Sequence, residues 1–512
     1  MEEKGKVWLA GAGPGDAGLL TVKTKELLEQ ADVIMYDALI SLEIFGQIPQ
    51  GKELIYVGKR AGSHTYSQTE INEMLLREAK KGKKVLRLKG GDPFIFGRGG
   101  EELELLVREG IPFEIVPGIT SAAAAAAYAG IPVTHRDYVS SFHVITGHAR
   151  KDGENRIQYE PLVKAGGTLV FLMGAAALER ICGGLLRAGM DRETPAAVIE
   201  QGTTSMQRKV TGKLGTIAER ARNEQIQAPA VIVVGQVCGL EKDFAWAEKR
   251  TFAGRQFLVT RPAEHQPALA GRLRSMGAQV IEMPAIQVRP VEENVRLEQA
   301  LREQILDERE KWMVFTSSIG VRIFFEMLGK SGLDIRDILR GRVKIAAIGQ
   351  ATKKKLLEYG WQTDLVPEEY CAGALGRELA ERAREGSSVR IFRARKGSEE
   401  LLPPLIERGL RVEDIPLYDT EHQIYGEERS RIKEGFAKGQ IDAVTFTSAS
   451  TVRGFVEAMG DMDYTGLEAV CIGRQTAREA EKYGMRIRIS EQASTASMVE
   501  LLISVYGNGE NG

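Results

Sequence analysis

The stretch Gly90–Glu102, with the sequence GGDPFIFGRGGEE, decides how this chain folds. It follows a predicted strand over Lys84–Leu88 and leads into a helix predicted over Glu101–Glu109. Glycine loses the most conformational entropy on folding, so a loop with five glycines is expected to lie close to a ligand. Asp92 falls at the carboxyl end of the strand, where open α/β sheets bind their ligands. Taken alone, the stretch also fits an ordinary loop whose acidic residues complement a helix N-terminus.

A second glycine loop, Gly11–Asp16, follows a predicted strand over Val7–Ala10. Its spacing is G-x-G-x-G and not the G-x-G-x-x-G of dinucleotide-binding proteins. Pro14 also removes a backbone N–H that a bound pyrophosphate would need. A nicotinamide-dependent oxidoreductase is therefore disfavoured, and a plain tight turn stays open for this loop by itself.

Strands and helices alternate along the chain, which predicts an α/β fold with largely parallel sheets. A helix is expected over Ser67–Lys81, and the small-residue run Ala122–Ala127 predicts a closely packed helix. Further strands are predicted at residues 31–36, 142–146, 168–173, 196–199 and 230–235. The charged stretch Gly239–Arg255 lacks an apolar period and is interpreted as a linker.

After this linker the sequence repeats itself at an offset of about 130 residues, far longer than a solenoid unit. Three blocks recur in the same order: Leu258–Arg261 with Arg390–Arg393, Val314–Ser317 with Thr445–Ser448, and Ile348–Thr352 with Ile472–Thr476. A duplicated α/β domain is predicted. The Ser, Thr and Gly residues of these blocks open helices, where they cap the helix and can also bind anions.

Bulk composition limits the classes of partner and site. The chain has 512 residues, enough for three or four domains, and a formal net charge of -1, which argues against nucleic acid or a membrane surface held by bulk electrostatics. No apolar stretch approaches the length of a membrane span, and no leader is evident. The four cysteines and six histidines show no metal-ligand spacing, so no metal is expected, and a reducing cytoplasm is the expected compartment.

Together, the two glycine loops resemble those of uroporphyrinogen-III C-methyltransferases, members of the precorrin methylase family, over about residues 5–240. Supporting blocks are residues 57–60 (VGKR), 116–122 (VPGITSA), 130–136 (GIPVTHR), 146–148 (TGH), 171–174 (FLMG) and 200–204 (EQGTT). The resemblance implies that S-adenosylmethionine binds in a cleft between two α/β domains. The residues it would contact are Pro14, Gly90, Gly91, Asp92, Ile95, Thr120, Ser121, Met173 and Gly202. Ser121 stands where many relatives have alanine, a small change.

The resemblance also assigns roles in catalysis. Asp37 would accept a proton and Lys59 would donate one, and Arg98 and Glu101 complete the catalytic set. An aspartate in the position of Asp37 is also common as a plain helix cap.

Other polar residues of the first half would contact the substrate, which carries eight carboxylates. Arg98, Arg136 and His148 are the expected contacts, because guanidinium groups bind carboxylates through paired hydrogen bonds. A surface salt bridge is the alternative for Arg136. His143 alternates with apolar residues and is predicted to be structural.

The second half resembles uroporphyrinogen-III synthase over about residues 252–506. The blocks are residues 259–262 (VTRP), 315–317 (FTS), 348–349 (IG), 416–420 (PLYDT), 446–448 (FTS) and 472–476 (IGRQT). This implies closure of hydroxymethylbilane to uroporphyrinogen III with inversion of ring D. Tyr418 is the candidate that assists departure of the hydroxyl, with a core aromatic as the alternative. Thr352, Ser448 and Thr476 are expected to bind carboxylates.

The two activities fit as consecutive steps, with methylation at C2 and C7 giving precorrin-2. The expected domains are residues 1–116 and 117–243 for the methyltransferase, a linker at 244–252, a first synthase domain of the flavodoxin-like type from 253–287 and 421–506, and an inserted second one at 288–420. The resemblance implies a homodimer through the first half. Two alternatives stay open: a second half that only binds tetrapyrroles, and a first half that methylates another corrin carbon.

Overall fold

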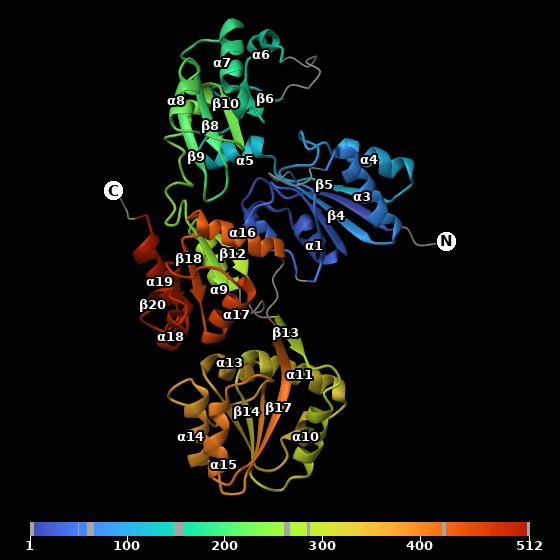
Figure 1. Ribbon diagram of the computed structural model, residues 1–512, viewed down its shortest axis with the longest axis vertical. Helices are drawn as coiled ribbons and strands as arrows, with labels where there is room; N and C mark the ends of the chain where they lie inside the picture. The colour runs from blue at the N-terminus through green and yellow to red at the C-terminus, as the bar shows by residue number, and fades with distance from the viewer. Residues whose placement is uncertain are drawn as a thin grey trace. The chain divides into compact units, whose positions relative to one another are not determined.

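The computed structural model describes residues 5–49, 51–58, 66–147, 157–260, 267–283, 287–421 and 426–508. The chain divides into two compact units, one of Met1–Ala285 with Ile424–Gly512 and one of Ile286–Gln423. Each unit is built from helices packed on β-sheets, which confirms the predicted α/β class (Figure 1). Within the described residues, none of the helices has both the length and the apolar character needed to cross a membrane.

The first sheet of the larger unit is parallel and has the order β3-β2-β4-β1-β5. Its strands are β1 (Lys6–Gly11), β2 (Val33–Tyr36), β3 (Glu53–Tyr56), β4 (Lys84–Lys89) and β5 (Phe113–Val116), and its helices are α1 (Val22–Gln30), α2 (Leu42–Phe45), α3 (Gln68–Lys80) and α4 (Gly99–Arg108). Apolar side chains lie on both faces of the central strands, as parallel sheets covered by helices require. The predicted helix over Ser67–Lys81 is confirmed as α3. It begins where it does because Ser67 and Glu70 form a capping box at its start.

The second sheet is mixed and is the exception to the expected, largely parallel arrangement of the sheets. Its order is β6-β7-β10-β8-β9, and only β6 and β7 run parallel. The strands are β6 (Phe142–Thr146), β7 (Thr168–Leu172), β8 (Pro195–Glu200), β9 (Arg208–Lys213) and β10 (Ala230–Val234), with helices α5 (Ser121–Tyr128), α6 (Tyr159–Ala165), α7 (Leu178–Arg187) and α8 (Ile217–Asn223). The connection from β8 to β9, residues 201–207, is too short for the crossover that parallel strands need.

The stretch interpreted as a linker, Gly239–Arg255, forms no helix or strand after the short turn of helix Gln236–Leu240. It is nevertheless packed against its surroundings. The Phe252 side chain is fully buried against Phe257, and the Trp246 indole N–H donates a 2.9 Å hydrogen bond to the carbonyl of Ala127.

The third sheet, also in the larger unit, is parallel with the order β12-β11-β18-β19-β20. Its strands are β11 (Gln256–Thr260), β12 (Gln279–Met283), β18 (Ala443–Phe446), β19 (Glu468–Cys471) and β20 (Arg486–Ile489), with helices α9 (Pro267–Ser275), α16 (Gly426–Ala437), α17 (Ala449–Met459), α18 (Arg474–Glu481) and α19 (Thr495–Tyr506). In chain order the strands follow the 2-1-3-4-5 pattern of flavodoxin-like sheets.

The smaller unit contains the fourth sheet, of order β13-β17-β16-β14-β15, in which only β13 is antiparallel to its neighbour. Its strands are β13 (Gln287–Pro290), β14 (Lys311–Phe315), β15 (Val343–Ala347), β16 (Ser388–Ala394) and β17 (Arg411–Glu421), with helices α10 (Val295–Leu306), α11 (Ser318–Ser331), α12 (Ile335–Ile338), α13 (Gln350–Glu358), α14 (Ala372–Arg382) and α15 (Leu402–Glu407).

The predicted internal repeat is confirmed by the order of the strands. The sequence blocks pair β11 with β16, β18 with β14 and β19 with β15. Along the third sheet the neighbours run β19-β18-β11-β12, and along the fourth they run β15-β14-β16-β17. The same strands are therefore adjacent in the same order in both copies.

Candidate functional site

Three loops at the carboxyl end of the first sheet approach one another so closely that only glycine fits. A Cβ built on Gly118 would lie 2.2 Å from the carbonyl oxygen of Gly91 and 2.6 Å from the Cα of Gly11. Gly13 and Gly91 exchange backbone hydrogen bonds of 3.2 and 2.7 Å across the same point. We call these four residues the glycine junction. It joins the two loops that the sequence singled out.

The Asp92 side chain links the loop after β4 to Gly118 in the loop after β5. One oxygen of its carboxylate accepts a 2.8 Å hydrogen bond from the Phe94 N–H, and the other accepts a 3.0 Å hydrogen bond from the N–H of Gly118. Gly91 has a φ of +68°, and a Cβ built there would meet no atom of the described residues within 4 Å. Within the part of the chain that the structure describes, open space therefore lies beside the backbone of this loop.

Strained backbone gathers in the loops that were predicted to contact a cofactor. Of the seven described residues other than glycine with positive φ, five are in these loops: Phe96, Arg98, Met173, Gln201 and Thr203. Each such residue lowers the stability of the fold by roughly 1–2 kcal/mol, and backbone strain of this kind concentrates at functional sites.

The second sheet contributes three of the segments expected at the cofactor. Met173 follows β7 and is 54% exposed, which an apolar side chain tolerates when it forms the wall of a binding site. Thr120 caps α5 by accepting from the N–H of Ala122, and Ser121 is the first residue of that helix. A Cβ on Gly202 would lie 2.4 Å from the Ala125 side chain, which confirms that the alanine run forms a closely packed helix.

The remaining cofactor candidates lie beside the glycine junction. Pro14 follows Gly13 and is half-buried, and Ile95 is 41% exposed on the loop after Asp92. Gly90 is close to the loop after β2, since a Cβ there would lie 2.6 Å from the Leu39 side chain.

A buried network of charges lies beneath Asp37, and the sequence did not reveal it. The side chains of Arg87, Lys89 and Glu102 are 3%, 7% and 1% exposed. One oxygen of Glu102, Oε1, lies 2.7 Å from the Lys89 ammonium and 3.3 Å from the Arg87 Nε. The other, Oε2, is buried and has no hydrogen-bond partner among the described residues. Arg87 and Lys89 are two positions apart on β4, so they share one face of the strand, and this spacing of two cations was the available signal.

This network places positive charge next to a predicted catalytic carboxylate. Arg87 Nη1 lies 3.8 Å from Asp37 Oδ2, while Asp37 Oδ1 accepts a 3.1 Å hydrogen bond from the N–H of Leu39. Burial and the neighbouring guanidinium of Arg87 lower the pKa of Lys89, although Glu102 opposes them. Asp37 therefore caps a turn through one carboxylate oxygen and lies near the Arg87 guanidinium through the other.

The other predicted residues of the first half are exposed or lie outside the described residues. Arg98 donates two hydrogen bonds, of 2.9 and 2.6 Å, to the Glu101 carboxylate on the surface, and this ion pair raises the pKa of Arg98. Arg136 is exposed in the turn between His135 and Val139. Lys59 and His148 lie outside the described residues.

His143 is confirmed as a structural histidine. Its Nε2 donates a 3.1 Å hydrogen bond to the carbonyl of Gly166. Among the described residues, no group of three His, Cys, Asp or Glu could hold a metal ion.

In the smaller unit, Tyr418 is 5% exposed and packs in the core of the fourth sheet. Its hydroxyl lies 2.8 Å from Ser317 Oγ, and Ser317 caps α11 by accepting a 2.9 Å hydrogen bond from the N–H of Gly320. The phenol is therefore both a core aromatic and a partner of a helix start at the carboxyl end of β14.

The four helix starts predicted from the repeated blocks are confirmed. Ser317 caps α11 and Ser448 caps α17 through their side chains. Gly349 and Gly473 stand at the starts of α13 and α18 without a side-chain cap. The predicted contacts Thr352 and Thr476 are 3% and 4% exposed, so their side chains are buried. At the helix starts before them, Gly349 is buried beside Tyr370 and Gly473 is half-buried.

Comparisons with known proteins match the two halves to two families. Residues 6–218 match the model of Tetrapyrrole (Corrin/Porphyrin) Methylases, and residues 267–500 match that of Uroporphyrinogen-III synthase HemD. The porphyrin biosynthesis protein HemD of Ruminiclostridium josui is 44% identical over 505 residues, covering 99% of both chains. A siroheme synthase of Stutzerimonas stutzeri is 50% identical over 251 residues, which is 49% of this chain and 54% of that protein.

Solved structures resemble each half separately. A uroporphyrin-III C-methyl transferase from Thermus thermophilus, complexed with S-adenyl homocysteine, has 39% identity and a TM-score of 0.40, covering 46% of this chain and 93% of its own. A mutant uroporphyrinogen III synthase from the same organism has 20% identity and a TM-score of 0.38, covering 48% and 96%.

Loss of the Glu102 carboxylate alone, with its cationic partners kept, is expected to destabilise the first sheet. Glu102→Gln leaves Arg87 and Lys89 as buried cations, and breaking such a pair costs about 3–5 kcal/mol. Hydrogen exchange of the β4 amides measures this local loss. The exposed Glu101→Gln is the control and should cost less than about 1 kcal/mol. Lys89→Met added to Glu102→Gln should recover part of the loss. Equal protection of β4 in Glu102→Gln and the wild type would contradict the network.

Proposed function

This chain belongs to the family of the Ruminiclostridium josui porphyrin biosynthesis protein HemD, and on that premise we propose that it closes hydroxymethylbilane to uroporphyrinogen III and then methylates the product. Methylation at C2 and C7 with S-adenosylmethionine gives precorrin-2. The observation that carries the proposal is that one porphyrin biosynthesis protein matches 99% of the chain, across both the methylase and the synthase segments. The two reactions are consecutive, so both belong to one tetrapyrrole route.

The glycine junction fits S-adenosylmethionine. The backbone of Gly91 faces open space, and the exposed apolar side chains of Ile95 and Met173 suit an adenosine group. Pro14, Gly90 and Asp92 would hold the group on the side of the first sheet, and Thr120, Ser121 and Gly202 on the side of the second. When bound, S-adenosylmethionine supplies an electrophilic methyl group. The protein's own part is mainly to orient the attacking pyrrole carbon, since positioning alone can lower such barriers by several kcal/mol.

The charged residues near the junction suit an acidic macrocycle. Arg98 and Arg136 are exposed and can bind substrate carboxylates through paired hydrogen bonds. Arg98 would exchange its present partner, Glu101, for the substrate. Asp37 would accept the proton released as the ring rearranges. Lys59 would donate a proton to the macrocycle.

The second half offers hydroxyls and helix starts to a substrate rich in carboxylates. Gly349 and Gly473 leave the first N–H groups of α13 and α18 without a side-chain cap, which favours anions. Ser448 and the N–H groups before Thr352 and Thr476 would add further contacts. Tyr418 would donate its proton to the departing hydroxyl of hydroxymethylbilane.

Product analysis tests the proposal directly. The purified full chain is given hydroxymethylbilane with and without S-adenosylmethionine, and the products are analysed by mass spectrometry and NMR. Uroporphyrinogen III is expected without the methyl donor, and a product with methyl groups at C2 and C7 is expected with it. Closure to the unrearranged isomer at the uncatalysed rate would leave the second half as a binding module. Methyl groups at other carbons would contradict the assignment of the first half.

Arg98→Ala is expected to abolish methylation while ring closure survives. Arg98 would bind a substrate carboxylate through two hydrogen bonds, and losing such a contact lowers the methylation rate roughly 100-fold or more. Steady-state rates of both reactions on the full chain measure the effect. Arg108→Ala, an exposed arginine at the other end of α4, is the matched control. Equal loss of both activities in a folded Arg98→Ala would contradict separate sites.

Tyr418→Phe is expected to slow ring closure by about 100-fold, because it removes the proposed proton donor, and to leave methylation of supplied uroporphyrinogen III unchanged. The change also breaks the hydrogen bond to Ser317, worth about 1 kcal/mol. Ser317→Ala breaks the same bond and keeps the phenol, so it separates the two effects. An unchanged closure rate in Tyr418→Phe would remove this residue from the site.

A further inference from the structure

Helix α2 (Leu42–Phe45) of the first sheet docks on the third sheet of the same unit. Leu42 packs against the hydrophobic core that contains Ile281 and Met283 of β12. A Cβ built on Gly46 would lie 2.9 Å from the carbonyl oxygen of Glu282, so the helix end approaches β12 closely. This helix follows Asp37 along the chain, which connects the docking surface to the proposed methylation site.

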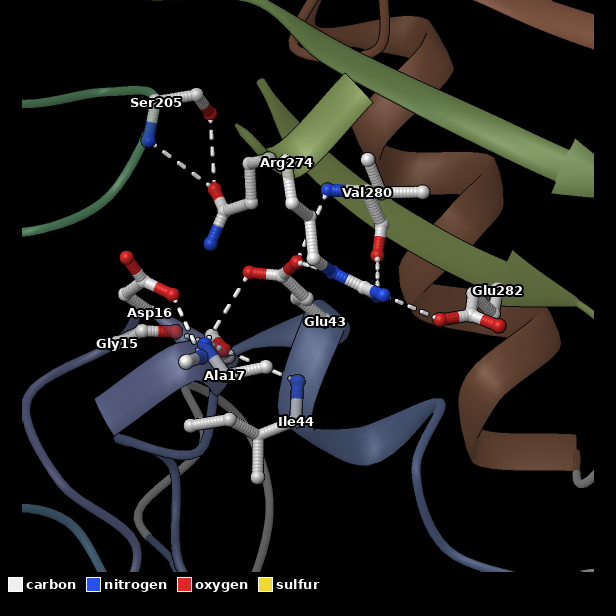
Figure 2. A network of polar contacts seen from close by, with 12 residues as sticks. Gly15, Asp16, Ala17, Glu43, Ile44, Ser205, Arg274, Val280 and Glu282 are labelled. Carbon is white, nitrogen blue, oxygen red and sulfur yellow. Dashed lines mark hydrogen bonds and ion pairs between the residues drawn. The ribbon is translucent and has the colours of Figure 1, made fainter. Parts of the chain in front are cut away.

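A single buried carboxylate joins the two sheets at this surface, as Figure 2 shows. The side chain of Glu43 is 2% exposed. Its Oε1 lies 2.6 Å from Arg274 Nε and accepts a 3.1 Å hydrogen bond from the N–H of Val280. Its Oε2 accepts a 3.3 Å hydrogen bond from the N–H of Ala17, next to the loop of the glycine junction.

All three nitrogens of the Arg274 guanidinium group donate hydrogen bonds in this contact. It lies in the last turn of α9, and besides Glu43 it donates to the Glu282 carboxylate at 2.5 Å and to the carbonyl of Val280 at 2.9 Å. Burial raises the pKa of Glu43, an effect that the Arg274 guanidinium opposes. Without Arg274, the Glu43 carboxylate would be a buried charge with only backbone partners.

The same helix reaches the loop of the glycine junction at a second point. Ser41 Oγ donates a 2.6 Å hydrogen bond to the carbonyl of Gly15 and caps α2 by accepting from the N–H of Ile44. Helix α2 therefore binds the loop Gly11–Asp16 at Gly15 through Ser41, and the residue directly after the loop, Ala17, through Glu43.

A second segment of the proposed cofactor site also rests on the third sheet. Ser205, which follows Gly202–Thr204, donates to the side chain of Gln279 from its N–H at 3.1 Å and from its hydroxyl at 2.9 Å. Thr203 Oγ1 accepts a 3.3 Å hydrogen bond from the N–H of Asp16. The third sheet thus contacts Ser205 directly. It also contacts α2, which in turn binds Gly15 and Ala17.

We propose that Arg274, a residue of the synthase segment, is a positioning residue for the methyltransferase: through Glu43 it fixes the loop Gly11–Asp16 in the conformation that binds the methyl donor. The inference rests on the proposed function of the first half. It makes binding of S-adenosylmethionine by one enzyme dependent on a side chain of the other. It requires no contact between Arg274 and either substrate.

The test compares Arg274→Ala with the matched control Arg272→Ala, an exposed arginine on the same helix. Calorimetric titration with S-adenosylhomocysteine and methylation kinetics are measured on the full chain. Arg274→Ala should raise both the Kd and the KM of the methyl donor about 10-fold and lower kcat less. Arg274→Lys should recover part of the affinity, because it keeps the charge without the fork. Closure of hydroxymethylbilane should stay within about 2-fold, which reports that the third sheet is intact.

A double variant keeps the test decisive if Arg274→Ala does not fold. Glu43→Gln with Arg274→Met removes both charges and keeps the volume, a change that buried ion pairs often tolerate. It should weaken nucleoside binding about as much as Glu43→Gln alone, because the two residues act as one unit.

Wild-type affinity in a folded Arg274→Ala or in the double variant would overturn this inference and leave the proposed function standing. Failure of the wild-type chain to bind the nucleoside would instead overturn the proposed function.

Discussion

The close approach of backbone at Gly11, Gly91 and Gly118 is the constraint on which the first half of the molecule depends. With no side chain between them, the loops after β1, β4 and β5 share one point at the carboxyl edge of the sheet. This contact places Asp92 where both its oxygens accept backbone hydrogen bonds, and it leaves open space beside Gly91. A Cβ at Gly118 would push these loops apart, so the shape of the site depends on glycine at that position.

Buried ions support this edge of the sheet from two sides. Glu102 balances Arg87 and Lys89 beneath Asp37, and Arg274 balances Glu43 beside Ala17. Replacing a buried ion pair by apolar groups is often neutral for stability, so such pairs contribute little to the free energy of folding. Their hydrogen-bond geometry, by contrast, restricts where each partner can lie. This difference favours a role for both networks in orienting loops.

Local signals were readable from the sequence, and contacts between distant segments were not. The glycine loops, the helix that Ser67 caps and the helix starts at Ser317 and Ser448 follow from short patterns, and the order of repeated blocks predicted the duplicated sheets. The antiparallel pairs of the second sheet were not predicted, because its apolar strands carry no sign of direction. Glu43 and Arg274 are 231 positions apart, and nothing in either neighbourhood marks them as partners. The roles given to individual site residues stay predictions.

The two copies of the repeat have diverged at the helix starts that correspond to one another. Ser317 and Ser448 cap equivalent helices, but the hydroxyl beside Ser317 is the phenol of Tyr418, whereas the hydroxyl beside Ser448 is that of Ser450. A phenol is a far stronger acid than an aliphatic alcohol, so among these paired hydroxyls only Tyr418 is suited to protonating a leaving group. On the proposed function, loss of a single hydroxyl needs only one acid. The difference between the two copies therefore favours Tyr418 over Ser450 as the residue to test for that role.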